Sequence, residues 1–355
     1  MGGYIKPIGG EQWFDIELFD KRVNNFQNIE AVFLMGGQSA IRFILEDIEI
    51  KYDEYILMPS YLCPSILHHI KKLKIKYEFY KINKDLSIDL EDIKEKVSKL
   101  KIKAVFFIDY FGFYHGKETL EYFQVLKNHN IIIVEDAVQM LWFNRRKFMG
   151  NYVFNSYRKF LPIDGAIVLC NKFKKFNAIK NSYYDSVNLA RSKKTVFEKF
   201  GIGKEDEFLS LYEKAEEEYY KAECILGIDH ETKKMLAMVD SNYISDIRRR
   251  NYIYLYDELI QNNQIQIIFD KNFIEDNTIL GLPILIENRD DIRRKLREFN
   301  IYCPVHWDIL KEEWLEKYTD SIYVSKRIIT LPIDQRYDLE DMDRVISSIS
   351  NLIRS

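Results

Sequence analysis

The 355-residue sequence has few cysteines, no long apolar run and little excess of either charge. Its four cysteines include no CxxC pair, which excludes the usual spacing of a zinc or redox site, and we expect them to be reduced thiols. No apolar stretch reaches the roughly 18 residues that span a bilayer, and the first residues contain no apolar signal segment. A net charge of -3 gives no electrostatic basis for binding nucleic acid. The sequence therefore predicts a cytoplasmic protein with neither membrane nor nucleic-acid partners.

Short apolar segments alternate with amphipathic segments over the first two-thirds of the chain. The apolar runs are typical of buried strands, and the segments between most of them have helical periodicity. The expected strands are 31–34, 55–58, 76–80, 104–108, 131–134 and 166–170, and the expected helices are 39–48, 64–73, 89–100 and 117–129. This order predicts an α/β fold in which helices cover both faces of a mostly parallel sheet.

The last third of the chain predicts a second, smaller α+β domain. A long helix at 240–261 leads into it, and a helix at 338–353 closes it. Between these helices, we expect strands at 265–269 and 279–286 and a helix at 289–299. We therefore divide the chain into an N-terminal segment (1–20), a large domain (21–238) and a small domain (239–355).

Three segments after predicted strands carry side chains suited to a cofactor. Ligands of open parallel sheets bind beyond the carboxyl ends of the strands. Residues 35–40 (Met-Gly-Gly-Gln-Ser-Ala) place glycines and an expected N-cap, Ser39, at a helix start, where free amides attract phosphate. Taken alone, such a segment is more commonly an ordinary strand–helix turn.

The second and third segments add an acid and a lysine. Asp136 follows an apolar strand and could pair with a protonated ring nitrogen, although a solvated or capping acid is an alternative. Lys159 lies three residues after Ser156, which could bind phosphate, and Arg158 could lower the lysine pKa. A single lysine would more commonly be a surface charge. Together, an anion site, a carboxylate and a Schiff-base lysine are what pyridoxal 5'-phosphate (PLP) requires.

Several motifs resemble those of the DegT/StrS-type sugar aminotransferases, which belong to the fold-type I (aspartate aminotransferase-like) PLP enzymes. Gly-Gly-Gln-Ser-Ala resembles the family's phosphate loop, and Val-Glu-Asp-Ala-Val-Gln (134–139) resembles one of its more specific signatures. Met-Pro-Ser-Tyr-Leu-Cys-Pro (58–64), Ile-Asp-Leu (88–90) and Leu-Pro-Ile (331–333) resemble three further family motifs. The resemblance runs from about residue 9 to 350.

The resemblance implies a role for each matching position. Asp136 and Lys159 would be catalytic: Asp136 would pair with the pyridine nitrogen, and Lys159 would form the Schiff base and move protons. The cofactor-binding residues would be Gly37, Gln38, Ser39 and Ser156 around the phosphate, Gln139 at the ring hydroxyl, and Tyr61 or Cys63 over the ring. No metal is implied. The site would lie between the subunits of a homodimer.

The implied activity is a transfer of an amino group, with glutamate as donor and a nucleotide-linked keto-sugar as acceptor, in surface polysaccharide or deoxysugar biosynthesis. The chain departs from the family at the lysine turn, where the gap between serine and lysine is shorter and the following glycine-rich segment is reduced to Asp-Gly-Ala (164–166). The partner-subunit Asn-x-Arg motif is not recognisable near 181–195. Two alternatives remain: a non-catalytic or regulatory protein that keeps the fold, and a sugar dehydratase. Dehydratases of this type replace the lysine with histidine, so Lys159 favours transamination.

Two other features could contribute to a substrate site. His306 could line the substrate cleft, although a packed or surface histidine is the more common case. The Arg-Arg-Arg run at 248–250 is expected to be a solvated helix face, with a diphosphate contact as the alternative.

Overall fold

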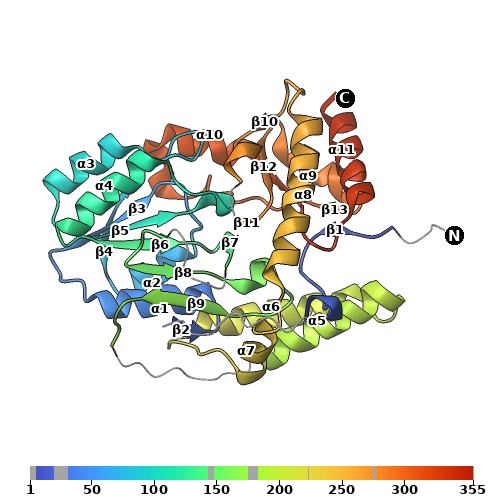
Figure 1. Ribbon diagram of the computed structural model, residues 1–355, viewed down its shortest axis with the longest axis horizontal. Coiled ribbons are helices and arrows are strands. Elements are labelled where there is room, and N and C mark those ends of the chain that lie inside the picture. Colours follow the sequence, from blue (N-terminus) through green and yellow to red (C-terminus); the bar gives the residue numbers. More distant parts are fainter. Residues whose placement is uncertain are drawn as a thin grey trace.

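A seven-stranded sheet forms the centre of the larger lobe in the computed structural model (Figure 1). The structure describes residues 5–19, 31–142, 148–174, 183–222, 224–274 and 277–354. In spatial order, the strands are β2 (Ala31–Leu34), β9 (Ala166–Cys170), β8 (Tyr152–Phe154), β6 (Ile132–Asp136), β5 (Ile102–Ile108), β3 (Tyr55–Pro59) and β4 (Lys76–Tyr80). The six predicted strands are present. Strand β8 was not predicted, because a strand of three residues is too short to show a pattern.

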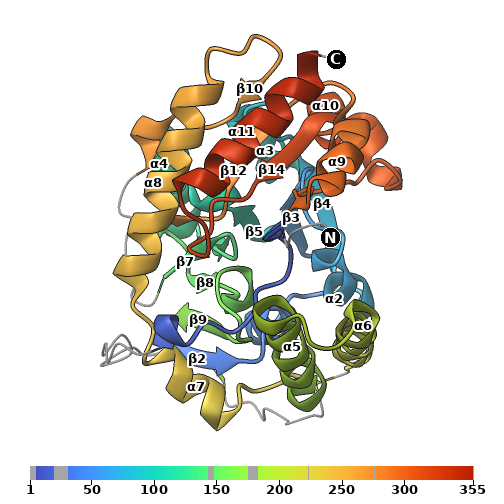
Figure 2. The same ribbon diagram turned by 90° about the vertical axis from the view of Figure 1, so that its right-hand side faces the viewer.

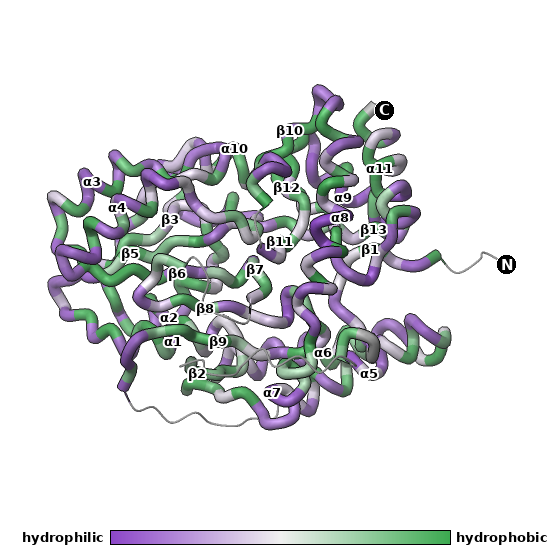
Figure 3. Tube along the Cα trace, in the orientation of Figure 1, coloured by the Kyte–Doolittle hydropathy of each residue, from purple (hydrophilic) through white to green (hydrophobic). Residues whose placement is uncertain are grey.

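All the strands of this sheet except β9 run in one direction. Neighbouring strands from β8 to β4 pair in parallel, whereas β9 pairs antiparallel with both β8 and β2. A parallel sheet is buried on both faces, which explains the hydrophobic colour along its central strands in Figure 3. Because the carboxyl ends of these strands share one edge, the loops that leave them converge there.

Helices cover both faces of the sheet, which confirms the predicted three-layer α/β arrangement. In Figure 1, α3 (Leu90–Lys99) and α4 (Lys117–Asn128) lie on one face, and α1 (Gly37–Ile48) and α2 (Ile66–Lys72) lie on the other. The first turn of α3 is fixed by Asp89, whose carboxylate accepts a hydrogen bond from the amide of Asp92. These layers enclose the main hydrophobic core of the lobe.

The smaller lobe has the predicted α+β composition. It follows α8 (Ser241–Leu259), which begins where the Asp240 carboxylate accepts hydrogen bonds from two first-turn amides. Its antiparallel sheet has the order β10-β12-β14, with helices packed beside it (Figure 2). The remaining elements are β10 (Gln266–Ile267), β12 (Leu282–Leu285), β14 (Ile328–Leu331), α9 (Arg289–Glu298), α10 (Thr319–Arg327) and α11 (Leu339–Arg354).

Two short strand pairs complete the arrangement. β1 (Ile8–Gly9) pairs in parallel with β13 (Ile301–Tyr302), so the N-terminal segment packs against the smaller lobe. Gly9 has a φ of 92°, and a Cβ at this position would lie 2.1 Å from the carbonyl oxygen of Tyr302, so the contact requires glycine. β7 (Met140–Leu141) pairs with β11 (Thr278–Ile279) and joins the two lobes. The domain boundary after residue 238 remains a proposal, and the one after residue 20 lies outside the described residues.

Two long helices form a hairpin beside the sheet (Figure 2). They are α5 (Tyr183–Phe200) and α6 (Glu205–Lys221), and α7 (His230–Leu236) follows them. Arg191 of α5 forms a buried ion pair with Asp164, which also accepts a hydrogen bond from the Tyr183 hydroxyl. The hairpin is therefore anchored directly to the turn that follows Lys159. Among the helices in the described part of the chain, none combines the length and apolar character needed to cross a bilayer.

Replacing Arg191 with methionine should destabilise the protein strongly. Arg191 and Asp164 side chains are each 3% exposed, so the variant would leave a buried carboxylate without its cation. We expect the free energy of unfolding, measured by urea denaturation, to fall by about 3 kcal/mol. Arg294→Met, which breaks exposed ion pairs on α9, is the control and should change it by less than about 1 kcal/mol. Equal losses in the two variants would contradict the anchoring role.

Candidate active site

The predicted acid, serine and lysine meet at the carboxyl edge of the sheet. Asp136 is the last residue of β6, and Ser156 follows the neighbouring β8. Lys159 ends a short 3-10 helix (Tyr157–Lys159) that begins directly after Ser156. Two adjacent parallel strands thus place an acid, a serine and a lysine from different parts of the sequence at the same edge of the sheet.

The Asp136 carboxyl group is almost completely buried. It accepts a hydrogen bond of 2.9 Å from the amide of Val138, and the residue is 5% exposed. Burial raises the pKa of Asp136 to about 7, although the nearby Lys159 charge opposes this rise. A buried carboxylate of this kind gains most from a cationic partner that enters the site.

The Lys159 amine is held in a setting that favours its neutral form. Burial lowers the pKa of Lys159 first, and the charge of Arg158 lowers it further. The predicted influence of Arg158 is therefore confirmed. An amine with a lowered pKa is a better nucleophile and proton acceptor at neutral pH.

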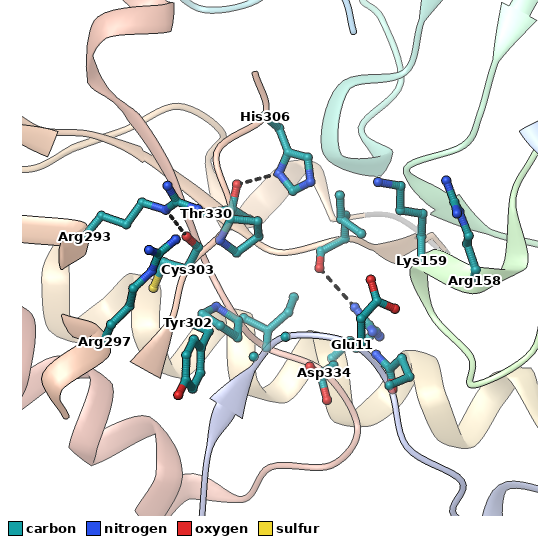
Figure 4. A pocket seen from close by; sticks show the side chains of 18 residues that line it. Glu11, Arg158, Lys159, Arg293, Arg297, Tyr302, Cys303, His306, Thr330 and Asp334 are labelled. Carbon is teal, nitrogen blue, oxygen red and sulfur yellow. Dashed lines mark hydrogen bonds between the residues drawn. The ribbon is translucent and has the colours of Figure 1, made fainter. Parts of the chain in front are cut away.

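A cleft of about 380 Å³ opens in front of Lys159 (Figure 4). His306, from the smaller lobe, points toward Lys159 across the cleft, and its Nδ1 lies 2.9 Å from the Thr330 hydroxyl. Burial, with a contribution from Lys159, lowers the pKa of His306 to about 3. His306 is therefore buried and also lines the cleft, which combines the two possibilities left open by the sequence.

The far side of the cleft is strongly cationic. Arg293 and Arg297, one turn apart on α9, lie there beside Tyr302, and Glu11 enters from the N-terminal segment (Figure 4). Sequence analysis missed these residues, because they come from elements far apart in the chain and match no motif. A cationic wall opposite an amine suits a substrate with anionic groups.

The arginine run at 248–250 was wrongly expected to be a solvated face throughout. Arg248 is 1% exposed and lines the cleft. Its guanidinium donates hydrogen bonds to the Gln335 side chain and to the carbonyls of Ile279 and Leu280. Arg248 therefore joins α8 to the interior of the smaller lobe, and periodicity alone could not show this because all three arginines look alike in the sequence.

The predicted phosphate loop does form a helix start, but its cap differs from the prediction. Helix α1 begins at Gly37 with Gly36 as its N-cap, so Ser39 lies in the first turn and the expectation that it caps the helix was wrong. Gly37 packs close to Ser156, since a Cβ there would lie 3.8 Å from the serine Cβ. The amides of Gln38 and Ser39 donate hydrogen bonds of 3.1 and 3.3 Å to the hydroxyl of Tyr219.

The three residues assigned to the cofactor ring differ in burial and in their hydrogen-bond partners. Gln139 is buried, and its side-chain oxygen accepts a hydrogen bond from the amide of Phe111. The Tyr61 hydroxyl is likewise engaged, at 2.6 Å from the His306 carbonyl. Cys63 is partly exposed, and its thiol lies 3.0 Å from the Ser65 hydroxyl. The structure thus favours Cys63 over Tyr61 as the residue facing the ring, and each assignment stays a prediction.

The donor set fits PLP at the ring end. PLP needs a carboxyl and an amine near each other, and buried Asp136 lies close enough to Lys159 for each to shift the pKa of the other. Gln139, three residues after Asp136, adds a buried carboxamide. At the phosphate end, the required donors are present as helix amides, Ser156 and Arg158, but Tyr219 takes two of the amides. The residues therefore fit the cofactor once the Tyr219 hydroxyl has left the two amides.

Comparison with solved structures supports the predicted fold. The chain superimposes on a putative sugar aminotransferase of Streptococcus pneumoniae (Spr1654, PMP form) with a TM-score of 0.67 and 13% identity, over 98% of this chain and 92% of that one. For Helicobacter pylori PseC, an aminotransferase of pseudoaminic acid biosynthesis, the TM-score is 0.65 and the identity 15%, over 98% and 93%. At this identity the likeness shows the fold, and the predicted α/β arrangement with a mostly parallel sheet is confirmed.

The family resemblance is confirmed as well. Residues 14–145 match the model of the DegT/DnrJ/EryC1/StrS aminotransferase family. The matched part includes the phosphate loop and the Asp136 motif and ends before Lys159, where the chain departs from the family pattern. A comparison with curated protein sequences finds no match.

Proposed function

We propose that this protein is a PLP-dependent aminotransferase that moves an amino group from glutamate to a nucleotide-linked keto-sugar. The observation that carries the proposal is that buried Asp136 lies close enough to the Lys159 amine for each group to shift the pKa of the other, while Lys159 lines the cleft. The sugar aminotransferases among the structural neighbours support the substrate class. We further propose a cytoplasmic homodimer that acts in surface polysaccharide or deoxysugar biosynthesis.

Each residue has a defined task in this reaction. PLP, when bound, supplies an electron sink for the charge left on the substrate carbon after its proton departs. Asp136 would hold the ring nitrogen of the cofactor and would keep it protonated. Lys159 would hold the cofactor and would carry the proton to and from the substrate carbon. His306 stays neutral at pH 7, so it adds no charge that would protonate or repel its neighbours.

The cationic side of the cleft supports an anionic substrate. Arg293 and Arg297 face the space that Lys159 enters from the opposite side. Arginine guanidinium groups bind phosphate and carboxylate oxygens in paired hydrogen bonds. A sugar nucleotide would place its diphosphate here while its keto group reaches Lys159.

An absorbance experiment tests this proposal directly. Purified protein with added PLP should acquire visible absorbance, and glutamate should remove it as the amino group passes to the cofactor. Nucleotide keto-sugars are then screened as acceptors that restore the absorbance. Protein that never acquires the absorbance would contradict the proposal, and absorbance that no amino donor changes would favour a dehydratase.

One observation favours the alternative of a non-catalytic protein that keeps the fold. The Tyr219 hydroxyl occupies two amides that the cofactor phosphate would use. If the amides remain closed in solution, the absorbance experiment gives no signal at any PLP concentration. The same contact also fits a catalytic protein in which the Tyr219 hydroxyl leaves these amides reversibly.

A further inference from the structure

Helix α6 places two side chains on the groups that a phosphate ester would use. Glu216 forms an ion pair with Arg158, and Tyr219 accepts the hydrogen bonds from Gln38 and Ser39. Residues three apart on a helix share a face, so one surface of α6 makes both contacts. A cation and the free amides of a helix start are together a common binding arrangement for phosphate.

Gly36 is fitted to this closed arrangement. A Cβ at position 36 would lie 2.7 Å from the Tyr219 hydroxyl oxygen, closer than non-bonded atoms approach. The φ of Gly36 is 177°, an extended conformation open to any residue, so its backbone does not explain the glycine. The close approach of the Tyr219 hydroxyl explains it instead, because the missing side chain at position 36 leaves room for this hydroxyl beside the amides of Gln38 and Ser39.

We propose that α6 reversibly closes the phosphate subsite of its own cofactor, with Glu216 and Tyr219 occupying the places of phosphate oxygens. Binding of PLP then displaces the Tyr219 hydroxyl from the amides and the Glu216 carboxylate from Arg158. This proposal rests on the proposed function, since it assumes that PLP is the ligand.

The charges of the competing groups favour replacement of the Tyr219 hydroxyl and the Glu216 carboxylate by the cofactor phosphate. Burial raises the pKa of Tyr219 to about 12, so the residue is a neutral acceptor at pH 7. Hydrogen bonds from amides to a charged phosphate are roughly twice as strong as those to a neutral oxygen. Glu216, whose side chain is 40% exposed, can return to water at small cost. The closed state therefore reduces the apparent affinity for PLP without preventing binding.

The experiment compares PLP with pyridoxal, which lacks the phosphate. Equilibrium titration and stopped-flow absorbance give the affinity and association rate of each. Tyr219→Phe keeps the ring and removes the hydroxyl, so PLP affinity should rise about three- to tenfold, the effect of one net hydrogen bond. Glu216→Gln should raise it in the same direction. Pyridoxal affinity should stay unchanged in both variants.

Tyr220→Phe is the matched control, because Tyr220 is the next residue on α6 and is 42% exposed. It should bind PLP as the wild type does. In the wild type, hydrogen–deuterium exchange of α6 peptides should increase when PLP is added, because the closing contacts are lost.

The outcomes separate this inference from the proposed function. If the wild type binds PLP and Tyr219→Phe binds it more weakly, Tyr219 is a permanent phosphate ligand and the closure is refuted. Unchanged PLP affinity in both variants refutes it as well, and leaves the proposed function intact. If neither the wild type nor any variant binds PLP, both proposals are wrong.

Discussion

Lys159→Ala should abolish the visible absorbance of the PLP-loaded protein and reduce amino transfer on the order of 10⁴-fold. The amine of Lys159 has two tasks, the covalent bond to the cofactor and the transfer of the proton. Its lowered pKa, caused by burial and Arg158, makes both possible near neutral pH. Alanine removes both at once, while PLP can still bind through Asp136 and the phosphate donors.

Borohydride trapping locates the covalent bond independently of activity. Reduction of the loaded wild type, followed by peptide mass analysis, should place the pyridoxyl group on Lys159. The control is Lys172→Ala, which removes an exposed lysine beyond β9 and should leave absorbance and trapping unchanged. Trapping on a different lysine, or unchanged absorbance in Lys159→Ala, would show that the assignment is wrong.

The sequence predicted the parts of the site that follow strands closely. Asp136 and Lys159 could be found because parallel strands deliver their carboxyl ends to one edge, whatever the details of packing. The same reasoning could not place His306, since its approach to Lys159 depends on how the two lobes meet. Strand β8, which positions Ser156, was too short to be seen in the periodicity.

Contacts between distant helices were beyond any pattern in the sequence. Tyr219 lies in a charged amphipathic helix, where a tyrosine gives no sign of reaching the start of α1. Ser39 was a reasonable N-cap by residue type, but the helix begins two residues earlier, at Gly37. The N-cap is Gly36, whose lack of a side chain lets the Tyr219 hydroxyl approach. The residue types of this segment determine roughly where helix α1 starts, and contacts with distant parts of the chain determine its first residue.

Asp136→Asn should slow amino transfer and yet stabilise the cofactor-free protein at alkaline pH. Asparagine cannot keep the ring nitrogen protonated, so we expect a rate loss on the order of 10²-fold or more. The stability effect follows from the raised pKa of Asp136, about 7 against an ordinary 3.8. The folded protein holds this proton more tightly than the unfolded chain, so the stabilisation is complete below pH 4 and is lost as pH rises through 7.

The size of the effect can be measured as a difference between two proteins. A pKa shift of this size corresponds to about 4 kcal/mol, so the unfolding free energy of Asp136→Asn should gain about that much on the wild type between pH 4 and 8. Burial also raises the pKa of Asp109 and Glu135. Both residues are present in the two proteins, so their contributions to the difference in unfolding free energy largely cancel. Asp246→Asn, at an exposed position on α8, should match the wild type in rate and stability. A variant that loses activity and gains no stability at pH 8 would mean that Asp136 is not buried as a charged group, and its proposed pairing with the ring nitrogen would fail with it.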